Sequence, residues 1–97
     1  APGIPTLISP PDGTVTGEPQ VTLTWQAGAG FSPETYDLEL DGVVVTTAGT
    51  SWTGPLDPGP HTWRVRAYNL AGYSDYTEEW ELIVAYRLYL PVGAGNP

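Results

Sequence analysis

The sequence predicts an all-β fold, a β-sandwich of seven short strands in one domain. Apolar and polar residues alternate through short segments, which is the period of a strand with one buried face, and no window has the spacing of an amphipathic helix. The 12 glycines and 11 prolines punctuate the chain as turns require. Because 97 residues supply one modest hydrophobic core, we expect a single domain.

The predicted strands follow one another with a turn between each pair. The clearest strand, residues 61–68, places three apolar side chains on one face and two arginines on the other. The pair Asp41-Gly42 separates two further strands, and such a pair favours the tight turn of a β-hairpin. The seven predicted strands are residues 5–9, 20–26, 35–40, 43–47, 50–53, 61–68 and 79–85.

Both ends of the chain lie outside this pattern. Residues 1–4 are predicted to form an extended N-terminal arm, because Pro2 and Pro5 bias the backbone away from helix. Residues 86–97 follow the last strand and are predicted to contain an extra extended strand with a Gly-rich end. We therefore expect the β-sandwich itself to occupy residues 5–85.

Several short segments occur in a fixed order along the chain. They are Ile8–Gly13, Val21–Trp25, Tyr36–Leu40, Leu56 before a Pro-Gly corner, and Trp63–Ser74. Together they resemble a fibronectin type III domain of the kind found in bacterial surface and secreted proteins, and the resemblance covers residues 5–85. It implies a seven-stranded, immunoglobulin-like β-sandwich.

One residue departs from the pattern of that family. Members usually carry a tyrosine where His61 stands, and its hydroxyl holds the preceding loop. The resemblance therefore implies one of two arrangements at this corner. Either a ring nitrogen of His61 replaces the hydroxyl, or Trp63 braces the corner by packing alone.

The strand order of the family also implies a pattern of charge. Residues 35–40, 61–68 and 79–85 would lie side by side in one sheet, with their outward side chains aligned. Two arginines would then stand between two columns of carboxylates, and opposite charges on neighbouring strands stabilise the register. The aligned residues would be Asp37, Glu39, Arg64, Arg66, Glu79 and Glu81.

The composition argues against several kinds of partner. The chain has 11 acidic residues, three arginines and no lysine, so its net charge is −8 and a polyanion such as nucleic acid would be repelled. No apolar run approaches the roughly 18 to 20 residues of a membrane span, so membrane insertion is not expected. The chain has no cysteine, and neither a disulfide nor a thiolate metal site can form.

No arrangement of residues predicts an enzyme. His61 is the single histidine, and no motif places it beside Ser51 or Ser74, as a catalytic base would require. The acidic segment 78–81 lacks the interleaved Asp, Asn and Gly of a calcium loop. We expect the histidine to be structural and the carboxylates to be solvated.

Aromatic residues offer one candidate ligand site. Trp25, Trp63 and Trp80 fall on the inward faces of their strands and are expected in the core. Four other aromatic residues could stack on the sugar rings of a polysaccharide. This candidate ligand strip consists of Trp52, Tyr68, Tyr73 and Tyr76.

The C-terminal extension is the segment with most functional content. Its first residues alternate, with one face made of Tyr86, Leu88, Leu90 and Val92. Because a complete sandwich has no position for another strand, we expect this segment to add itself to a sheet edge of a neighbouring copy. Such a head-to-tail contact propagates as a filament. Docking within the same chain and a linker into a further domain are the alternatives.

These observations predict a non-catalytic, extracellular structural module, secreted or on the cell surface, that forms a filament or other homo-oligomer through its C-terminal strand. The alternative is a carbohydrate-binding or spacer module accessory to a secreted enzyme, which the resemblance also permits. No cofactor and no metal site are predicted. The expected partners are other copies of the chain, with a polysaccharide as the alternative ligand.

Overall fold

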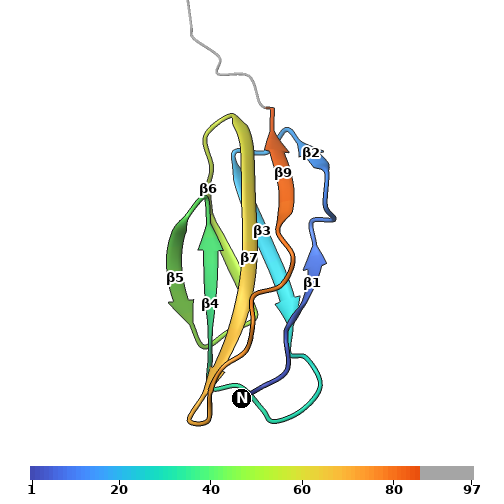
Figure 1. Cartoon of the computed structure of the whole chain (residues 1–97). Coiled ribbons are helices and arrows are strands. Elements are labelled where there is room, and N and C mark those ends of the chain that lie inside the picture. Colours follow the sequence, from blue (N-terminus) through green and yellow to red (C-terminus); the bar gives the residue numbers. More distant parts are fainter. Residues whose placement is uncertain (86–97) are drawn as a thin grey trace, which may run out of the picture.

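The structure is a computed structural model that describes residues 1–85 of the chain, which form two facing β-sheets (Figure 1). Nine strands make up these sheets in the described residues. They are β1 (Thr6–Ser9), β2 (Thr14–Thr16), β3 (Gln20–Gln26), β4 (Thr35–Leu40), β5 (Val43–Thr47), β6 (Ser51–Pro55), β7 (Gly59–Asn69), β8 (Gly72–Tyr73) and β9 (Trp80–Val84). The predicted all-β sandwich is confirmed.

The two sheets differ in size. One has three strands in the order β1-β3-β6, and the other has six, with β2-β9-β7-β4-β5 in order and β8 beside β7. Neighbouring strands are antiparallel, except that β2 and β9 run parallel. This order places β5 at one edge of the larger sheet and β2 at the other (Figure 1).

The structure contains every predicted strand and adds two short ones, β2 and β8. β2 has only three residues, between Gly13 and Gly17, and a strand this short cannot be recognised from the alternation of polar and apolar residues. It forms because the chain crosses from the smaller to the larger sheet after β1. The crossing is fixed where Gly13 N donates to the Glu81 carbonyl at 2.8 Å and Glu81 N donates to Asp12 Oδ1 at 2.7 Å.

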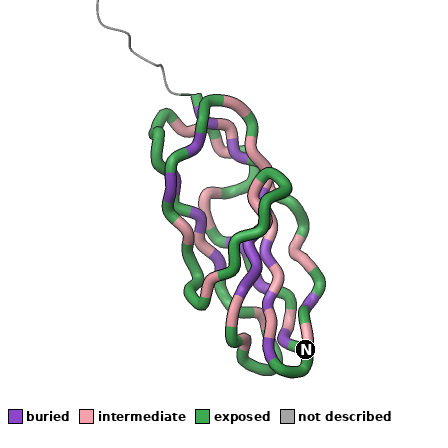
Figure 2. The backbone as a smooth tube through the Cα atoms, turned by 90° about the vertical axis from the view of Figure 1, so that its left-hand side faces the viewer, coloured by how far each residue is buried: buried purple, intermediate pink, exposed green. Residues whose placement is uncertain are grey.

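The core lies between the inner faces of the two sheets. Along β3 and β7, buried residues alternate with less buried ones, as the period of a half-buried strand requires. Figure 2 shows buried positions interspersed with more exposed ones along the backbone. Trp25 and Trp63 are buried as predicted, and Trp80 packs against them from a partly buried position, with its ring edge-on to Trp63 at 5.9 Å. Burying an apolar side chain of this kind contributes about 1.5–3 kcal/mol.

The N-terminal arm packs on the loop between β3 and β4. Pro2 is buried and forms an isolated bridge with Phe31. At Gly28 a Cβ atom would lie 2.0 Å from the carbonyl oxygen of Ile4, so only glycine fits this close backbone approach. The arm is therefore part of the packed structure, whereas the predicted extra strand in residues 86–97 lies outside the described residues.

Candidate functional site

The outward face of β4 and β7 carries two ion pairs. Arg66 Nε donates to Asp37 Oδ2 at 3.0 Å, and Arg64 Nε donates to Glu39 Oε1 at 2.5 Å. The strand register places the members of each pair directly opposite one another. The predicted pairing of both arginines with the carboxylates of β4 is confirmed.

Asp37 is the most enclosed of these charges. Its side chain is only 8% exposed although it lies on the outward face. Thr46 on β5 donates from Oγ1 to Asp37 Oδ1 at 2.8 Å, so both carboxylate oxygens accept a hydrogen bond, which makes burial of the charge tolerable. The alternation of polar and apolar residues does not identify Thr46 as a partner of Asp37. The two-residue turn at 41–42 does, because it fixes the hairpin register that sets Thr46 opposite Asp37.

The predicted second column of carboxylates is wrong for Glu81 but not for Glu79. The pKa of Arg64 is raised chiefly by its hydrogen bond to Glu39, and the negative charge of Glu79 contributes to the same shift. β9 begins at Trp80, and Glu81 stands opposite Thr62 rather than an arginine. The reason is that residues 74–77 run beside the second half of β7 in place of β9. There Ser74 N donates to the Ala67 carbonyl at 2.8 Å and Thr77 N donates to the Val65 carbonyl at 2.9 Å.

Two tyrosines, Tyr73 and Tyr76, lie over the guanidinium groups of the arginines. The guanidinium carbon of Arg66 is 3.8 Å from the ring centre of Tyr73 and 4.9 Å from that of Tyr76. The guanidinium carbon of Arg64 is 4.3 Å from the Tyr76 ring centre. Cation–π contacts of this kind contribute about 0.5–1 kcal/mol at exposed sites. Burial raises the pKa of the Tyr76 hydroxyl, which keeps it neutral at physiological pH.

The structure brings together three residues of the candidate ligand strip. The rings of Tyr68 and Tyr73 lie 4.8 Å apart, and Arg66 lies over both Tyr73 and Tyr76. Trp52 lies in β6 of the other sheet, where it packs against the core. Its ring covers Gly54, at which a Cβ atom would lie 2.6 Å away. Tyr73 is the most open of the three grouped rings, being 51% exposed.

His61 connects two turns at one corner of the sandwich. Its Nδ1 lies 2.6 Å from Asp41 Oδ2, and its Nε2 lies 2.7 Å from the carbonyl oxygen of Asp57. Both partners are acceptors, so only the doubly protonated ring donates to both. Burial lowers the pKa of His61, but the hydrogen bonds to Asp41 and Asp57 and their negative charges raise it by more, so the pKa lies above its ordinary value.

This corner resolves the choice left by the sequence. A ring nitrogen of His61 holds the preceding loop, in the role expected of a tyrosine hydroxyl. Asp41 is the partner that sequence reasoning missed. Its backbone φ of 52° belongs to the tight turn between β4 and β5, and its Oδ1 also accepts from Thr62 N at 3.0 Å.

The candidate catalytic residues do not meet. Ser74 is buried, and its Oγ accepts from Ala67 N and donates to the Asp75 carbonyl, both at 2.9 Å. Ser51 lies in β6, in the sheet opposite to that of His61. Among residues 1–85, no three side chains of His, Cys, Asp or Glu are grouped so that they could hold a metal ion. No helix in that part of the chain is long and apolar enough to span a bilayer.

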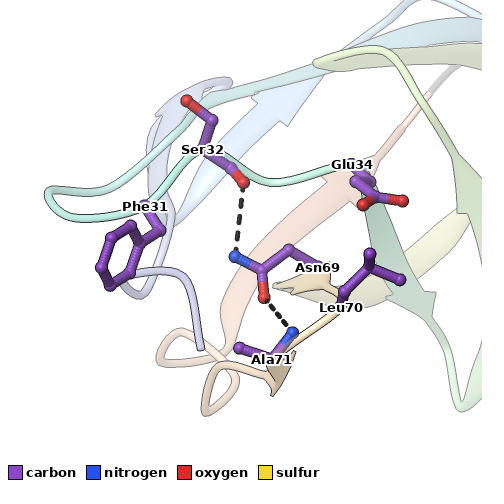
Figure 3. A pocket seen from close by; sticks show the side chains of 6 residues that line it. All are labelled: Phe31, Ser32, Glu34, Asn69, Leu70 and Ala71. Atoms are coloured by element: carbon purple, nitrogen blue, oxygen red, sulfur yellow. Dashed lines mark hydrogen bonds between the residues drawn. The ribbon is translucent and has the colours of Figure 1, made fainter.

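A hollow of about 420 Å³ lies between the β3–β4 loop and the β7–β8 turn (Figure 3). The side chain of Asn69 links the two segments, because its Nδ2 donates to the Ser32 carbonyl at 3.4 Å and its Oδ1 accepts from Ala71 N at 2.8 Å. Exposed apolar side chains of Phe31 and Leu70 flank this link. The sequence predicted the turn at 69–72 but not the hollow, which arises where two distant loops converge. The lining residues are Phe31, Ser32, Glu34, Asn69, Leu70 and Ala71.

β5 forms an open edge of the larger sheet within the described residues. It pairs with β4 over five residues without a bulge, and Val43, Val44 and Val45 are all exposed. Val43 and Val45 stand opposite Leu40 and Leu38, so they belong to the inward face of the sheet. Their exposure means that the smaller sheet does not cover the larger one at this edge.

The predicted interface residues cannot be placed on this framework. They are Tyr86, Leu88, Leu90 and Val92, and all four lie outside the described residues. Their role as interface anchors stays a prediction.

Solved structures share this fold, whereas no family model and no curated protein matches the chain. The fibronectin(III)-like modules of CbhA from Clostridium thermocellum are 18% identical over 84% of this chain and 97% of theirs, with a TM-score of 0.70. A mutant of FN3tt is 20% identical over 87% of this chain and 94% of its own, with a TM-score of 0.57. At these identities the likeness is one of fold. The chain is a fibronectin type III-like β-sandwich, as the resemblance implied.

Proposed function

We propose that the protein is a non-catalytic, extracellular structural module, secreted or on the cell surface, that assembles with other copies of itself through residues 86–92. The segment at the end of the chain and the surface that receives it are different, so the contact is head-to-tail, and the proposed assembly is an open filament rather than a closed ring.

One observation carries this proposal. Residues 1–85 complete the sandwich and bury its core, so residues 86–92 are surplus to the fold. Yet these surplus residues keep the alternation of a half-buried strand, with Leu88 and Leu90 at its centre. A segment with that pattern is stabilised by a sheet edge, which supplies backbone hydrogen bonds and a surface for alternate side chains.

The described residues support a structural role over a catalytic one. The single histidine has both nitrogens engaged by Asp41 and Asp57, so it is not free to act as a base. Both arginines of the outward face are paired with carboxylates and covered by tyrosines. The polar groups that could do chemistry are thus used to hold strands and turns together.

Truncation tests the proposal directly. A chain that ends at Ala85 is expected to remain folded but monomeric, while the full chain assembles. As a matched pair, Leu88→Ser with Leu90→Ser changes the apolar face of the segment and Tyr89→Ser changes the opposite face. The double variant is expected to lose assembly and the single variant to keep it. Equal mass by light scattering for the full and truncated chains would contradict the proposal.

A spacer or carbohydrate-binding module accessory to a secreted enzyme is the second candidate. The fold likeness to modules of CbhA favours a spacer, and the exposed ring of Tyr73 favours a sugar ligand. However, Arg66 lies 3.8 Å from that ring centre and occupies one of its faces. Titration with polysaccharides, followed by tryptophan and tyrosine fluorescence, tests the sugar ligand. A saturable change that Tyr73→Ala abolishes would favour it, and no change would count against it.

A further inference from the structure

The sandwich has four sheet edges in its described part, and three of them are protected against strand addition. β1 is bracketed by Pro5 and Pro10, and its register with β3 is irregular. β2 has only three residues. β6 ends in Gly54-Pro55, and proline cannot donate a backbone hydrogen bond. Prolines, bulges and short length are the usual means by which proteins prevent strands from pairing with other chains.

β5 has none of these protections. Its five residues, Val-Val-Val-Thr-Thr, contain no charge, proline or glycine, and every one is in regular register with β4. Val43 is 65% exposed, although it lies on the inward face of the sheet. A regular, uncharged edge of β-branched residues binds other strands readily. The chain as a whole has no lysine, the residue most often used to block such edges.

Residues 86–90 match this edge. They are five consecutive residues free of proline, followed by Pro91, and β5 also has five residues. Their alternation would place Tyr86, Leu88 and Leu90 on the inward side, beside Val43 and Val45. Arg87 and Tyr89 would then lie on the outward side, the face on which β4 carries Asp37 and Glu39. Apolar side chains thus meet apolar ones, and the charged side chain of the segment stays on the outward face, where Asp37 and Glu39 are already paired with Arg66 and Arg64.

The β5 edge of the same chain is too far away for this pairing. β9 ends at Val84 and is separated from β5 by β7 and β4, which makes three strand spacings of about 4.8 Å, or about 14 Å. The two strands are also displaced along the sheet. Val84 stands opposite Gly59 of β7, whereas Val43 pairs with Leu40, which in turn pairs with Trp63 of β7. Val84 and Val43 are therefore four residues apart along the strand direction. From Val84 to Tyr86 the chain extends at most about 7 Å. A strand that begins at Tyr86 therefore reaches only the β5 of another molecule.

We propose that residues 86–90 of one copy add as an outer strand to the β5 edge of a second copy. This inference rests on the proposed function and names its acceptor. Each molecule donates from the end of β9 and accepts at β5, on opposite sides of the larger sheet (Figure 1), so the contact propagates from copy to copy. The exposed inward face at Val43 and Val45 is extended by the apolar side chains of the donor strand.

Cysteine cross-linking tests the acceptor, because the natural chain has no cysteine. Val45 and Leu88 are each the third of five residues, so they oppose one another in a fully paired strand of either direction. A mixture of Val45→Cys and Leu88→Cys full-length chains is expected to give a covalent heterodimer under mild oxidation. Val15→Cys, in the middle of β2 at the opposite edge, mixed with Leu88→Cys is the control and is expected to give none.

Charge substitution gives a second, independent readout. Val43 and Val15 are 65% and 64% exposed on opposite edges of one sheet, so lysine at either position is compatible with the fold. Val43→Lys is expected to abolish assembly and Val15→Lys to leave it intact.

The outcomes separate the two proposals. If truncation at Ala85 abolishes assembly but Val43→Lys does not, and no cross-link forms between Val45→Cys and Leu88→Cys, the proposed function stands and β5 is not the acceptor. If a chain that carries both cysteines forms only an internal disulfide at every concentration, residues 86–90 pair with β5 of the same chain and not with that of a second copy. If truncation leaves the mass unchanged, both proposals fail.

Discussion

β4 and β5 are neighbours in one hairpin, but they differ in what surrounds them. β4 has a strand on each side, its inward residues Tyr36 and Leu38 are buried, and its outward carboxylates are paired with arginines. β5 has a strand on one side within the described residues and exposes valines on both faces. Both strands have side chains that suit a sheet. The neighbours of each strand and the absence of charge on β5 together separate the structural strand from the candidate binding edge.

The two strands differ in whether their polar groups already have partners within the described residues. On β4 the polar groups are satisfied by the chain itself, through Arg64, Arg66 and Thr46. On β5 a complete row of regularly spaced backbone groups faces outward with apolar side chains beside it. Substitutions on β4 should therefore change stability, and substitutions on β5 should change assembly.

The largest expected difference in stability comes from a pair of residues that face each other across the hairpin. Leu38 is fully buried and stands opposite Val45. Leu38→Ala is expected to lower the free energy of unfolding by about 2–5 kcal/mol, because it leaves a cavity in the core. Val45→Ala is expected to cost less than about 1 kcal/mol, because its side chain is partly in water. Urea denaturation of both variants in the truncated background measures the difference, and equal losses would contradict the contrast between the strands.

The next effect concerns the buried carboxylate of β4. Asp37→Ala removes the acceptor of both Arg66 and Thr46, and it is expected to cost about 1–3 kcal/mol. Thr46→Val keeps the shape of the side chain on β5 but deletes only one of these hydrogen bonds. It serves as the matched control and should cost less than Asp37→Ala in the same unfolding experiment. A loss for Thr46→Val that equals the loss for Asp37→Ala would show that the ion pair contributes nothing.

The turn between β4 and β5 should make stability depend on pH. The pKa of His61 is raised in the folded protein, so its contribution is fully present below the unfolded pKa of about 6.5 and is lost as pH rises through the folded pKa. We expect the urea midpoint to fall across that upper range. His61→Gln should remove this dependence, and Asp41→Asn should reduce it, because Asp41 is the charge that favours the protonated ring. If the urea midpoint of His61→Gln fell with pH as much as that of the natural chain, His61 would not be the group responsible.

The smallest expected effect is at the outer ion pair. Arg64 and Glu39 are both partly exposed, so Glu39→Gln is expected to cost less stability than Asp37→Ala. The loss should diminish further at high salt, because water and ions screen such a pair. Unfolding measured at low and high salt checks this. If Glu39→Gln lowered the free energy of unfolding by more than Asp37→Ala does, the more buried ion pair would not be the more stabilising one, which would contradict this prediction.

The sequence was sufficient for most of the fold. Alternation and turn pairs predicted every strand longer than three residues, including β7 with its buried Trp63. It also predicted the pairing of Arg64 and Arg66 with the carboxylates of β4. The strands themselves depend on alternation and on turn pairs, which are local properties of the chain. The pairing of β4 with β7, which brings the charges together, was implied by the resemblance to the fibronectin type III family rather than by any local pattern.

Other features could not be read from the sequence because they depend on distant segments. The tyrosines over Arg66 are there because residues 74–77 displace β9 from part of β7, and no local pattern encodes that displacement. Trp52 lies in the other sheet because strand order, rather than alternation, decides which aromatic residues meet. The exposure of Val43 likewise depends on how far the smaller sheet extends over the larger one.

Residues 86–92 are proposed to join copies of a completed sandwich. The most direct test is the mass of the full chain, the chain ending at Ala85 and the Val43→Lys variant, measured by light scattering over a range of concentrations. The mass of the full chain is expected to rise with concentration, while the other two chains remain monomeric. A full chain that stays monomeric throughout, or a truncated chain that assembles equally, would contradict this proposal.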